Sequence, residues 1–250
     1  MGNPILVAIS GTNGRMGHAL QTLLQDDQRF NLVARISASD EWNAAPELDV
    51  VIDFSTPAGF DAALAHCEKH GIALVSGTTG LGAVQCAAIG EAAREIAVLH
   101  SANFSLGVTV LARVLREAAA ALPNWDLEIV EAHHARKLDA PSGTALALGR
   151  TAAEARGQVF DAVAVRGREG QIGARPHGAI GFASIRAGDI VGEHTAILAS
   201  AGERLEFSHR ATDRAIFARG ALHAAAWIAA KAPGVYSLDD VLAAGVKRKQ

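Results

Sequence analysis

The chain has 250 residues, of which 50% are hydrophobic and 20% charged, and its formal net charge is −3. This length allows one large domain or two smaller ones, each with its own hydrophobic core. A charge so close to neutral excludes nucleic acid and anionic membrane surfaces as main partners. No apolar run reaches membrane-spanning length, and no signal sequence precedes the first predicted strand, so we expect a cytoplasmic protein.

The first hundred residues alternate short apolar runs with helical patterns. Near-continuous apolar strands alternating with helices are typical of a parallel sheet covered on both faces. We therefore expect a Rossmann-like, doubly wound α/β domain in this part of the chain. The predicted strands are 5–10, 32–36, 49–54, 72–76 and 96–99, and the predicted helices end at Leu24 or span 61–70 and 84–94.

The pattern changes after Asn103. Three later segments alternate apolar and polar residues and are separated by Gly-Asp and Gly-Glu turns, which indicates an open, mixed or mostly antiparallel sheet in a second, α+β domain. These segments are 178–186, 190–200 and 204–209. We also predict strands at 127–132 and 162–166, and helices at 108–122, 144–155 and 214–231.

The chain has two cysteines, Cys67 and Cys86. Two cysteines provide neither a disulfide framework nor metal-ligand spacing, so we predict no metal site. Both lie in alanine-rich helical patterns, and we expect both to be buried structural thiols.

A glycine-rich turn joins the first predicted strand to the first helix. It reads Gly11-x-x-Gly14-x-x-Gly17, with Asn13 at the middle position of the usual G-x-G-x-x-G dinucleotide fingerprint. We interpret it as a dinucleotide-binding turn. The alternative is a tight turn that needs a positive φ angle and binds nothing.

The end of the second predicted strand lacks the acidic residue that normally holds the ribose 2′-hydroxyl of NAD. Ser37 stands there, and the first acidic residues are Asp40 and Glu41. Arg35 either approaches a 2′-phosphate or points onto the sheet surface. We expect NADH and NADPH both to be accepted, with a lean towards NADPH.

Two further loops, 77–80 (Gly-Thr-Thr-Gly) and 101–104 (Ser-Ala-Asn-Phe), follow predicted strands of the same sheet. Ligands of open α/β sheets bind at these carboxyl ends. Small hydroxyl and amide groups suit a carboxamide or a phosphate, although each loop alone is equally typical of an ordinary connection.

A cationic cluster follows the predicted strand at 127–132. It contains His133, His134, Arg136 and Lys137, and Ser142 to Thr144 then open a helix. Cations facing a helix N-terminus predict a pocket for a multiply charged anion such as a dicarboxylate, whereas the alternative is a solvated basic face. Histidine and a desolvated lysine also supply protons. Asp139 either orients one of them or caps the turn, and we favour the cap.

Five motifs of this chain occur together and in one order. On them the chain resembles the family of 4-hydroxy-tetrahydrodipicolinate reductase, also called dihydrodipicolinate reductase, over nearly its whole length. They are 11–17 (Gly-x-x-Gly-Arg-Met-Gly), 77–80, 101–105 (Ser-Ala-Asn-Phe-Ser), 131–145 (Glu-Ala-His-His-x-x-Lys-x-Asp-Ala-Pro-Ser-Gly-Thr-Ala) and 186–195 (Arg-Ala-Gly-Asp-Ile-Val-Gly-Glu-His-Thr).

The resemblance implies a homotetramer that uses NADH or NADPH to reduce a cyclic dicarboxylate in the diaminopimelate route to lysine. It implies that 214–250 return to a dinucleotide-binding domain formed by 1–104, and that 105–213 form a substrate-binding and oligomerisation domain. Many members of the family have Glu-Arg where this chain has Ser37-Ala38, which leaves the choice of cofactor open.

The resemblance also implies roles for individual residues. His133 would donate or accept a proton and Lys137 would donate one, while His134, Gly143 and Thr144 would hold substrate carboxylates. The residues implied at the pyrophosphate are Gly11, Thr12, Asn13, Gly14, Arg15 and Met16, and those at the nicotinamide end are Gly77, Thr78, Thr79, Ser101, Ala102, Asn103 and Phe104.

Two other classes of protein remain as alternatives. One is another two-domain NAD(P)-dependent dehydrogenase. A semialdehyde dehydrogenase would need a cysteine in a strand-end loop, where neither cysteine is predicted. The other is a non-catalytic dinucleotide-sensing protein, which would have no use for His133 and Lys137 opposite a carboxylate site.

Overall fold

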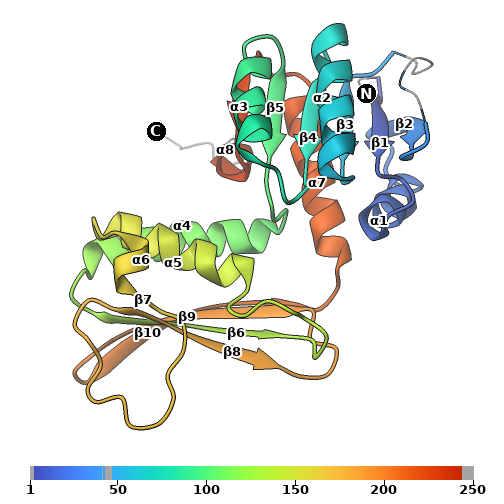
Figure 1. Ribbon diagram of the computed structural model, residues 1–250. Helices are drawn as coiled ribbons and strands as arrows, with labels where there is room; N and C mark the ends of the chain where they lie inside the picture. Colours follow the sequence, from blue (N-terminus) through green and yellow to red (C-terminus); the bar gives the residue numbers. More distant parts are fainter. Residues whose placement is uncertain (1–2, 41, 43–46, 244–250) are drawn as a thin grey trace. The chain divides into compact units, whose positions relative to one another are not determined.

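The computed structural model describes residues 3–40, 42 and 47–243, so that Glu41 lies outside the described part. Figure 1 shows the model coloured along the chain. The chain forms two compact units, the first from the described parts of 1–106 and 215–250 and the second from 107–214.

The first unit is built on a six-stranded sheet in the order β11-β5-β4-β3-β1-β2. Every neighbouring pair is parallel, which confirms the predicted doubly wound sheet. The strands are β1 (Ile5–Ser10), β2 (Phe30–Ile36), β3 (Val50–Asp53), β4 (Ala73–Ser76), β5 (Ala97–His100) and β11 (Gly234–Tyr236). The sequence analysis missed β11 because three residues are too few to show a period.

Helices cover both faces of this sheet, and alternate strand residues therefore enter two different cores. Val7 and Ile9 of β1 join one core with α1 (Arg15–Leu24), α7 (Ala215–Ile228) and α8 (Leu238–Ala243). Ala8 between them joins the other core, with α2 (Pro57–His70) and α3 (Ala83–Ala92). Burial on both faces explains why the central strands are apolar up to their last residue, where a polar side chain stands.

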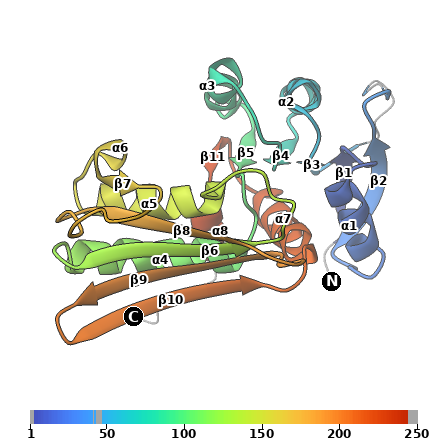
Figure 2. The same ribbon diagram turned by 60° about the horizontal axis from the view of Figure 1, so that its bottom comes forward.

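The second unit contains a five-stranded sheet in the order β10-β9-β6-β8-β7. Its β6 pairs antiparallel with β9 and parallel with β8, and this sheet is therefore mixed. Helices α4 and α5 cover one face of the sheet (Figure 2) and share a core with it. The elements are α4 (Leu106–Ala121), β6 (Asp126–His133), α5 (Gly143–Ala155), α6 (Phe160–Val163), β7 (Ala164–Val165), β8 (Ile180–Arg186), β9 (Gly192–Ser200) and β10 (Glu203–Ala211).

Two expectations about local structure need correction. The strand predicted at 162–166 is present but reduced to β7, Ala164–Val165, because Phe160 is buried in the core and starts the one-turn helix α6. Cys67 is buried as expected, but Cys86 is exposed. On α3 the buried residues are Ile89 and Ala92, and Cys86 lies outside that face.

Among the residues that the model describes, no helix is long and apolar enough to cross a membrane. Within the same residues, no group of three or more His, Cys, Asp or Glu side chains is placed to hold a metal ion.

Candidate functional site

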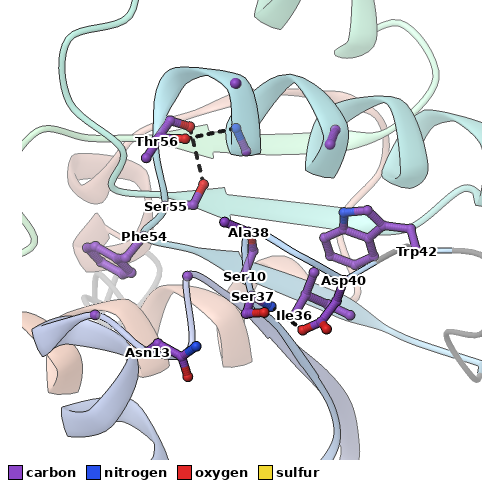
Figure 3. A pocket seen from close by; sticks show the side chains of 15 residues that line it. Ser10, Asn13, Ile36, Ser37, Ala38, Asp40, Trp42, Phe54, Ser55 and Thr56 are labelled. Carbon is purple, nitrogen blue, oxygen red and sulfur yellow. Dashed lines mark hydrogen bonds between the residues drawn. The ribbon is translucent and has the colours of Figure 1, made fainter.

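A pocket of about 440 Å³ lies at the carboxyl ends of β1, β2 and β3 (Figure 3). The strand order reverses here, because β2 lies on one side of β1 and β3 on the other. Ligands of doubly wound sheets bind at such a switch point. Phe54 lies at one end of the pocket, and Trp42 and Asp40 lie at the other.

The glycine-rich turn forms one wall of this pocket. Gly11 has φ +80°, and a Cβ atom on it would lie 2.3 Å from the carbonyl oxygen of Phe54. The turn therefore requires this glycine whether or not it binds a ligand. Two features fit a phosphate: the Thr12 hydroxyl is buried with no partner among the described residues, and Gly14 begins α1 without a side-chain cap. Uncapped first-turn N–H groups attract anions.

The chain after β2 supplies an acidic residue to the same pocket. Asp40 lines the pocket, and its Oδ2 accepts a hydrogen bond from the backbone N–H of Ser37 at 2.7 Å. The Ser37 side chain and backbone lower the pKa of this carboxyl group. Arg35 instead donates from Nε to Gln21 Oε1 at 3.1 Å and does not line the pocket. The Arg35 side chain is therefore bonded to α1 and is not part of the pocket lining.

The loops after β4 and β5 lie beside each other in the first unit. The Ser101 N–H donates to the carbonyl of Ser76 at 3.0 Å. The Phe54 ring, which lines the pocket, lies within 3 Å of where a Gly77 Cβ atom would be and contacts the Phe104 ring edge-on. Thr78 and Phe104 are buried, whereas Thr79 and Ala102 are exposed. The side chains of Thr78 and Phe104 thus point inward, and Thr79 and Ala102 are members of these loops that face solvent.

The second unit holds a buried carboxylate at the centre of its polar cluster. Glu131 on β6 is 1% exposed and accepts two hydrogen bonds from Arg186, at 2.7 and 2.8 Å. It also accepts bonds from His133 Nδ1 at 2.5 Å and from the Ser142 N–H at 3.2 Å. Burial alone would raise the pKa of Glu131, but hydrogen bonds from Arg186, Ser184 and His133 outweigh burial and lower it to about 2.

This carboxylate fixes the orientation of His133. Because Nδ1 donates to Glu131, the other ring nitrogen, Nε2, is the atom available to a ligand. A Cβ atom on Gly192 would lie 3.1 Å from His133 Nε2, so a side chain there would crowd the ring. The glycine at 192 leaves this side of the ring open.

His194 supports the same cluster from β9. It is 4% exposed, its Nε2 lies 3.1 Å from Ser142 Oγ, and its ring meets the His133 ring edge-on at 5.2 Å. Ser142 Oγ also accepts from the Ala145 N–H and so caps α5. Burial, with a smaller contribution from the charge of His133, lowers the pKa of His194 to about 4. His194 is therefore neutral at neutral pH.

The low pKa of His194 predicts a loss of stability in acid. The unfolded chain binds a proton below the ordinary value of 6.5, whereas the folded chain does not until about pH 4. The contribution of neutral His194 to the free energy of unfolding is therefore complete above pH 6.5. It decreases by about 3 kcal/mol as the pH falls to 4. Urea unfolding between pH 7.5 and 4 should show this slope, and His194→Gln should remove it. The exposed His177→Gln is the control and should keep the slope; an unchanged slope in His194→Gln would contradict the prediction.

Lys137 lies in the turn that follows β6. Its Nζ atom is 2.8 Å from Asp139 Oδ1, and this contact lowers the pKa of Asp139. The Asp139 side chain thus reaches back two residues to the cation, which is the contact that an orienting role would need.

The remaining predicted residues of the second unit lie around the same turn. Partial desolvation and the nearby cations Arg214 and Arg136 lower the pKa of His134, and its Nδ1 has no partner among the described residues. Gly143 and Thr144 form the first turn of α5. This cluster combines a neutral histidine, a lysine and a helix N-terminus, which together suit an anionic ligand that receives a proton.

The sequence analysis assigned no role to Glu131, Arg186 or His194. One signal was available for Glu131, because residues i and i+2 of a strand lie on the same face, which places Glu131 beside His133. For Arg186 and His194 the signal was their place in the motif 186–195, which does not identify their partners. Arg186 lies 55 residues from Glu131 along the chain, and His194 lies 52 residues from Ser142, so only the folded sheet brings these partners together.

The two units together have the plan of a two-domain, dinucleotide-dependent oxidoreductase, with a switch-point pocket on a doubly wound sheet and a polar cluster around Glu131 on a separate sheet. Residues 5–104 match the family model described as dihydrodipicolinate reductase, N-terminus, and residues 107–242 match the model for its C-terminus. The chain belongs to the dihydrodipicolinate reductase family, as its motifs predicted.

Relatives agree with this family, and a solved structure agrees with the fold. The chain is 43% identical to the 4-hydroxy-tetrahydrodipicolinate reductase of Nitrosomonas eutropha, covering 94% of this chain and 97% of that protein. It is 44% identical to the reductase of the same name from Caulobacter vibrioides, covering 97% and 98%. The fold is similar to that of a dipicolinate-bound dihydrodipicolinate reductase from Paenisporosarcina sp. TG-14, with TM-score 0.75, 24% identity and coverage of 94% and 97%.

Proposed function

We propose that this protein reduces 4-hydroxy-2,3,4,5-tetrahydrodipicolinate to tetrahydrodipicolinate with NADH or NADPH, in the diaminopimelate route to lysine. The observation that carries the proposal is the cluster of the second unit, where Glu131 binds both His133 and the N–H of Ser142 at the start of α5, and Lys137 pairs with Asp139 in the turn between them. A cyclic dicarboxylate needs both anion-binding groups and a proton donor, and this cluster offers both.

The proposed division of labour follows the two units. We assign dinucleotide binding to 1–104 with 214–250, and substrate binding to 105–213. The switch-point pocket, the unpartnered Thr12 hydroxyl and the uncapped start of α1 support the first assignment. The residues proposed to hold the cofactor are Gly11, Thr12, Asn13, Gly14, Arg15 and Met16 at the pyrophosphate, and Gly77 to Thr79 with Ser101 to Phe104 at the nicotinamide end.

The chemistry of the reaction defines what the substrate cluster must do. The substrate loses its hydroxyl group as water, which leaves a conjugated imine, and a bound reduced nicotinamide supplies a hydride to a ring carbon. Lys137 Nζ delivers the proton that the adjacent ring position then needs, and its positive charge stabilises the negative charge that develops there. Arg136 is unsuited to this task because a guanidinium does not readily deprotonate.

The neighbouring groups bind and orient the substrate. His134 and the first turn of α5 at Gly143 and Thr144 hold the two carboxylates, through charge-assisted hydrogen bonds and the positive end of the helix. His133 presents Nε2 towards the ligand because its Nδ1 is occupied by Glu131. From this position it can protonate the hydroxyl group that leaves as water.

A reductase assay tests this function directly. The purified protein should oxidise NADH or NADPH only when the cyclic substrate is present. Oxidation with other carbonyl substrates but not with this one would favour another two-domain dehydrogenase. Dinucleotide binding without turnover would favour a sensing protein. Cys67 and Cys86 lie on α2 and α3, so neither is placed in a strand-end loop as a semialdehyde dehydrogenase would require.

The choice between NADH and NADPH depends on Asp40. Its carboxylate lines the pocket beyond β2 and so repels a 2′-phosphate, and we propose a preference for NADH in place of the lean to NADPH drawn from sequence. Asp40→Asn should raise the ratio of kcat/KM for NADPH to that for NADH about tenfold, which corresponds to about 1.4 kcal/mol. Steady-state kinetics with both cofactors measure it.

Asp26→Asn is the control for this change, since Asp26 is exposed and does not line the pocket. The ratio should stay the same in this variant. An unchanged ratio in Asp40→Asn would show that Asp40 does not face the ribose.

We also propose a homotetramer located in the cytoplasm. An apolar side chain on the face of the second sheet that no helix covers supports assembly, because Ile185 of β8 is 49% exposed there. The free thiols of Cys67 and Cys86 support a reducing compartment. Sedimentation of the purified protein measures the assembly.

A further inference from the structure

A buried carboxyl group at the end of β3 has no part in the function proposed above. Asp53 is fully buried, and no Lys, Arg or His among the described residues forms an ion pair with it. Burying a carboxylate without a cation is costly unless hydrogen-bond donors surround it. The groups that donate hydrogen bonds to Asp53 therefore indicate its role.

Three hydroxyl groups donate to this carboxylate. Ser55 Oγ donates to Oδ1 at 2.5 Å, while Ser76 Oγ and Thr78 Oγ1 donate to Oδ2 at 2.8 and 2.7 Å. Ser55 follows β3, Ser76 ends β4, and Thr78 lies in the loop after β4. Asp53 thus joins two loops at the carboxyl edge of the sheet.

Thr78 is held on further sides as well. Its hydroxyl accepts from the Ser55 N–H at 3.0 Å, and its carbonyl accepts from His100 Nε2, at the end of β5, at 2.9 Å. Ser55 lines the switch-point pocket, and Phe54 beside it packs under Gly77. The network that starts at Asp53 therefore sets where the backbone of 77–79 lies relative to this pocket.

We infer that Asp53 is a positioning residue of the dinucleotide site, which holds the backbone of 77–79 in place for the nicotinamide end of the cofactor. This inference rests on the proposed function. Asp53 itself is buried beneath the loops and acts through Ser55, Ser76 and Thr78. Its loss should therefore affect the nicotinamide half of the cofactor more than the ADP-ribose half.

The binding of NADH and of ADP-ribose to Asp53→Asn tests this difference. The Kd for NADH should rise at least tenfold, while the Kd for ADP-ribose should change less than threefold. The exposed Asp26→Asn is the control and should change neither. An equal loss of both ligands, or no loss of either, would overturn the inference and leave the proposed function standing. A wild-type protein that binds no dinucleotide would overturn both.

A second pair of variants covers the case in which Asp53→Asn does not fold. Thr78→Val keeps the size of the side chain but removes the hydroxyl, whereas Thr78→Ser keeps the hydroxyl. Thr78→Val should weaken NADH binding about as much as Asp53→Asn, and Thr78→Ser should retain it. Equal NADH affinity in these two variants would overturn the inference, because the hydroxyl bond to Asp53 would then have no effect on the cofactor.

Discussion

Replacing Lys137 by alanine should lower kcat by about 10²–10⁴-fold, the usual contribution of a general acid. The free energy of unfolding should change by less than about 0.5 kcal/mol, because the ion pair with the exposed Asp139 contributes little to stability. Steady-state kinetics and urea unfolding of the same preparations measure the two effects.

Two further variants distinguish proton donation by Lys137 from the effect of its positive charge. Lys137→Arg keeps the positive charge but not a transferable proton, so its KM should stay close to that of the wild type while kcat falls. Arg136→Ala removes an exposed cation from the same turn and should keep its turnover. A Lys137→Ala protein with normal turnover would remove Lys137 from the mechanism.

Replacing Glu131 by glutamine should affect both stability and turnover. The change leaves the Arg186 guanidinium without its buried counter-charge, which should lower the free energy of unfolding by about 3–5 kcal/mol at neutral pH. It also removes the carboxylate that fixes the His133 ring, and turnover should fall for that reason. Urea unfolding and kinetics at pH 7 measure these losses.

The contribution of Glu131 to the free energy of unfolding should decrease in acid. The pKa of its carboxyl group is about 2 in the folded protein against an ordinary value of 4.5. This difference stabilises the fold by about 3 kcal/mol above pH 4.5, and the contribution is lost as the pH falls towards 2. The gap in stability between wild type and Glu131→Gln should therefore narrow over this range, and a constant gap would contradict the assignment.

The double variant Glu131→Gln with Arg186→Gln distinguishes a structural from a functional role. Without either charge, no unpaired ion is buried, so much of the lost stability should return. Turnover should stay low, because His133 still lacks its carboxylate partner. Recovery of turnover together with stability would mean that Glu131 only supports the fold.

The helices and strands of this protein, and its α/β fold class, follow from local patterns in the sequence. Apolar runs such as 50–52 need cover on both faces, and the Gly11 turn needs a positive φ angle whatever it binds. These are short-range requirements of the backbone and of burial. The family motifs likewise lie in continuous segments, which is why they identified the reductase family before any contact was known.

Only the tertiary structure decided which side chains act together. The sequence around β2 indicated a site without an acid, yet the turn at Ser37 brings Asp40 into the pocket. Glu131 meets Arg186 because β6 and β8 are neighbours in the sheet, and Asp53 meets Thr78 because β3 and β4 are. Strand order and register are set by packing of the whole unit, and no local spacing in the sequence records them.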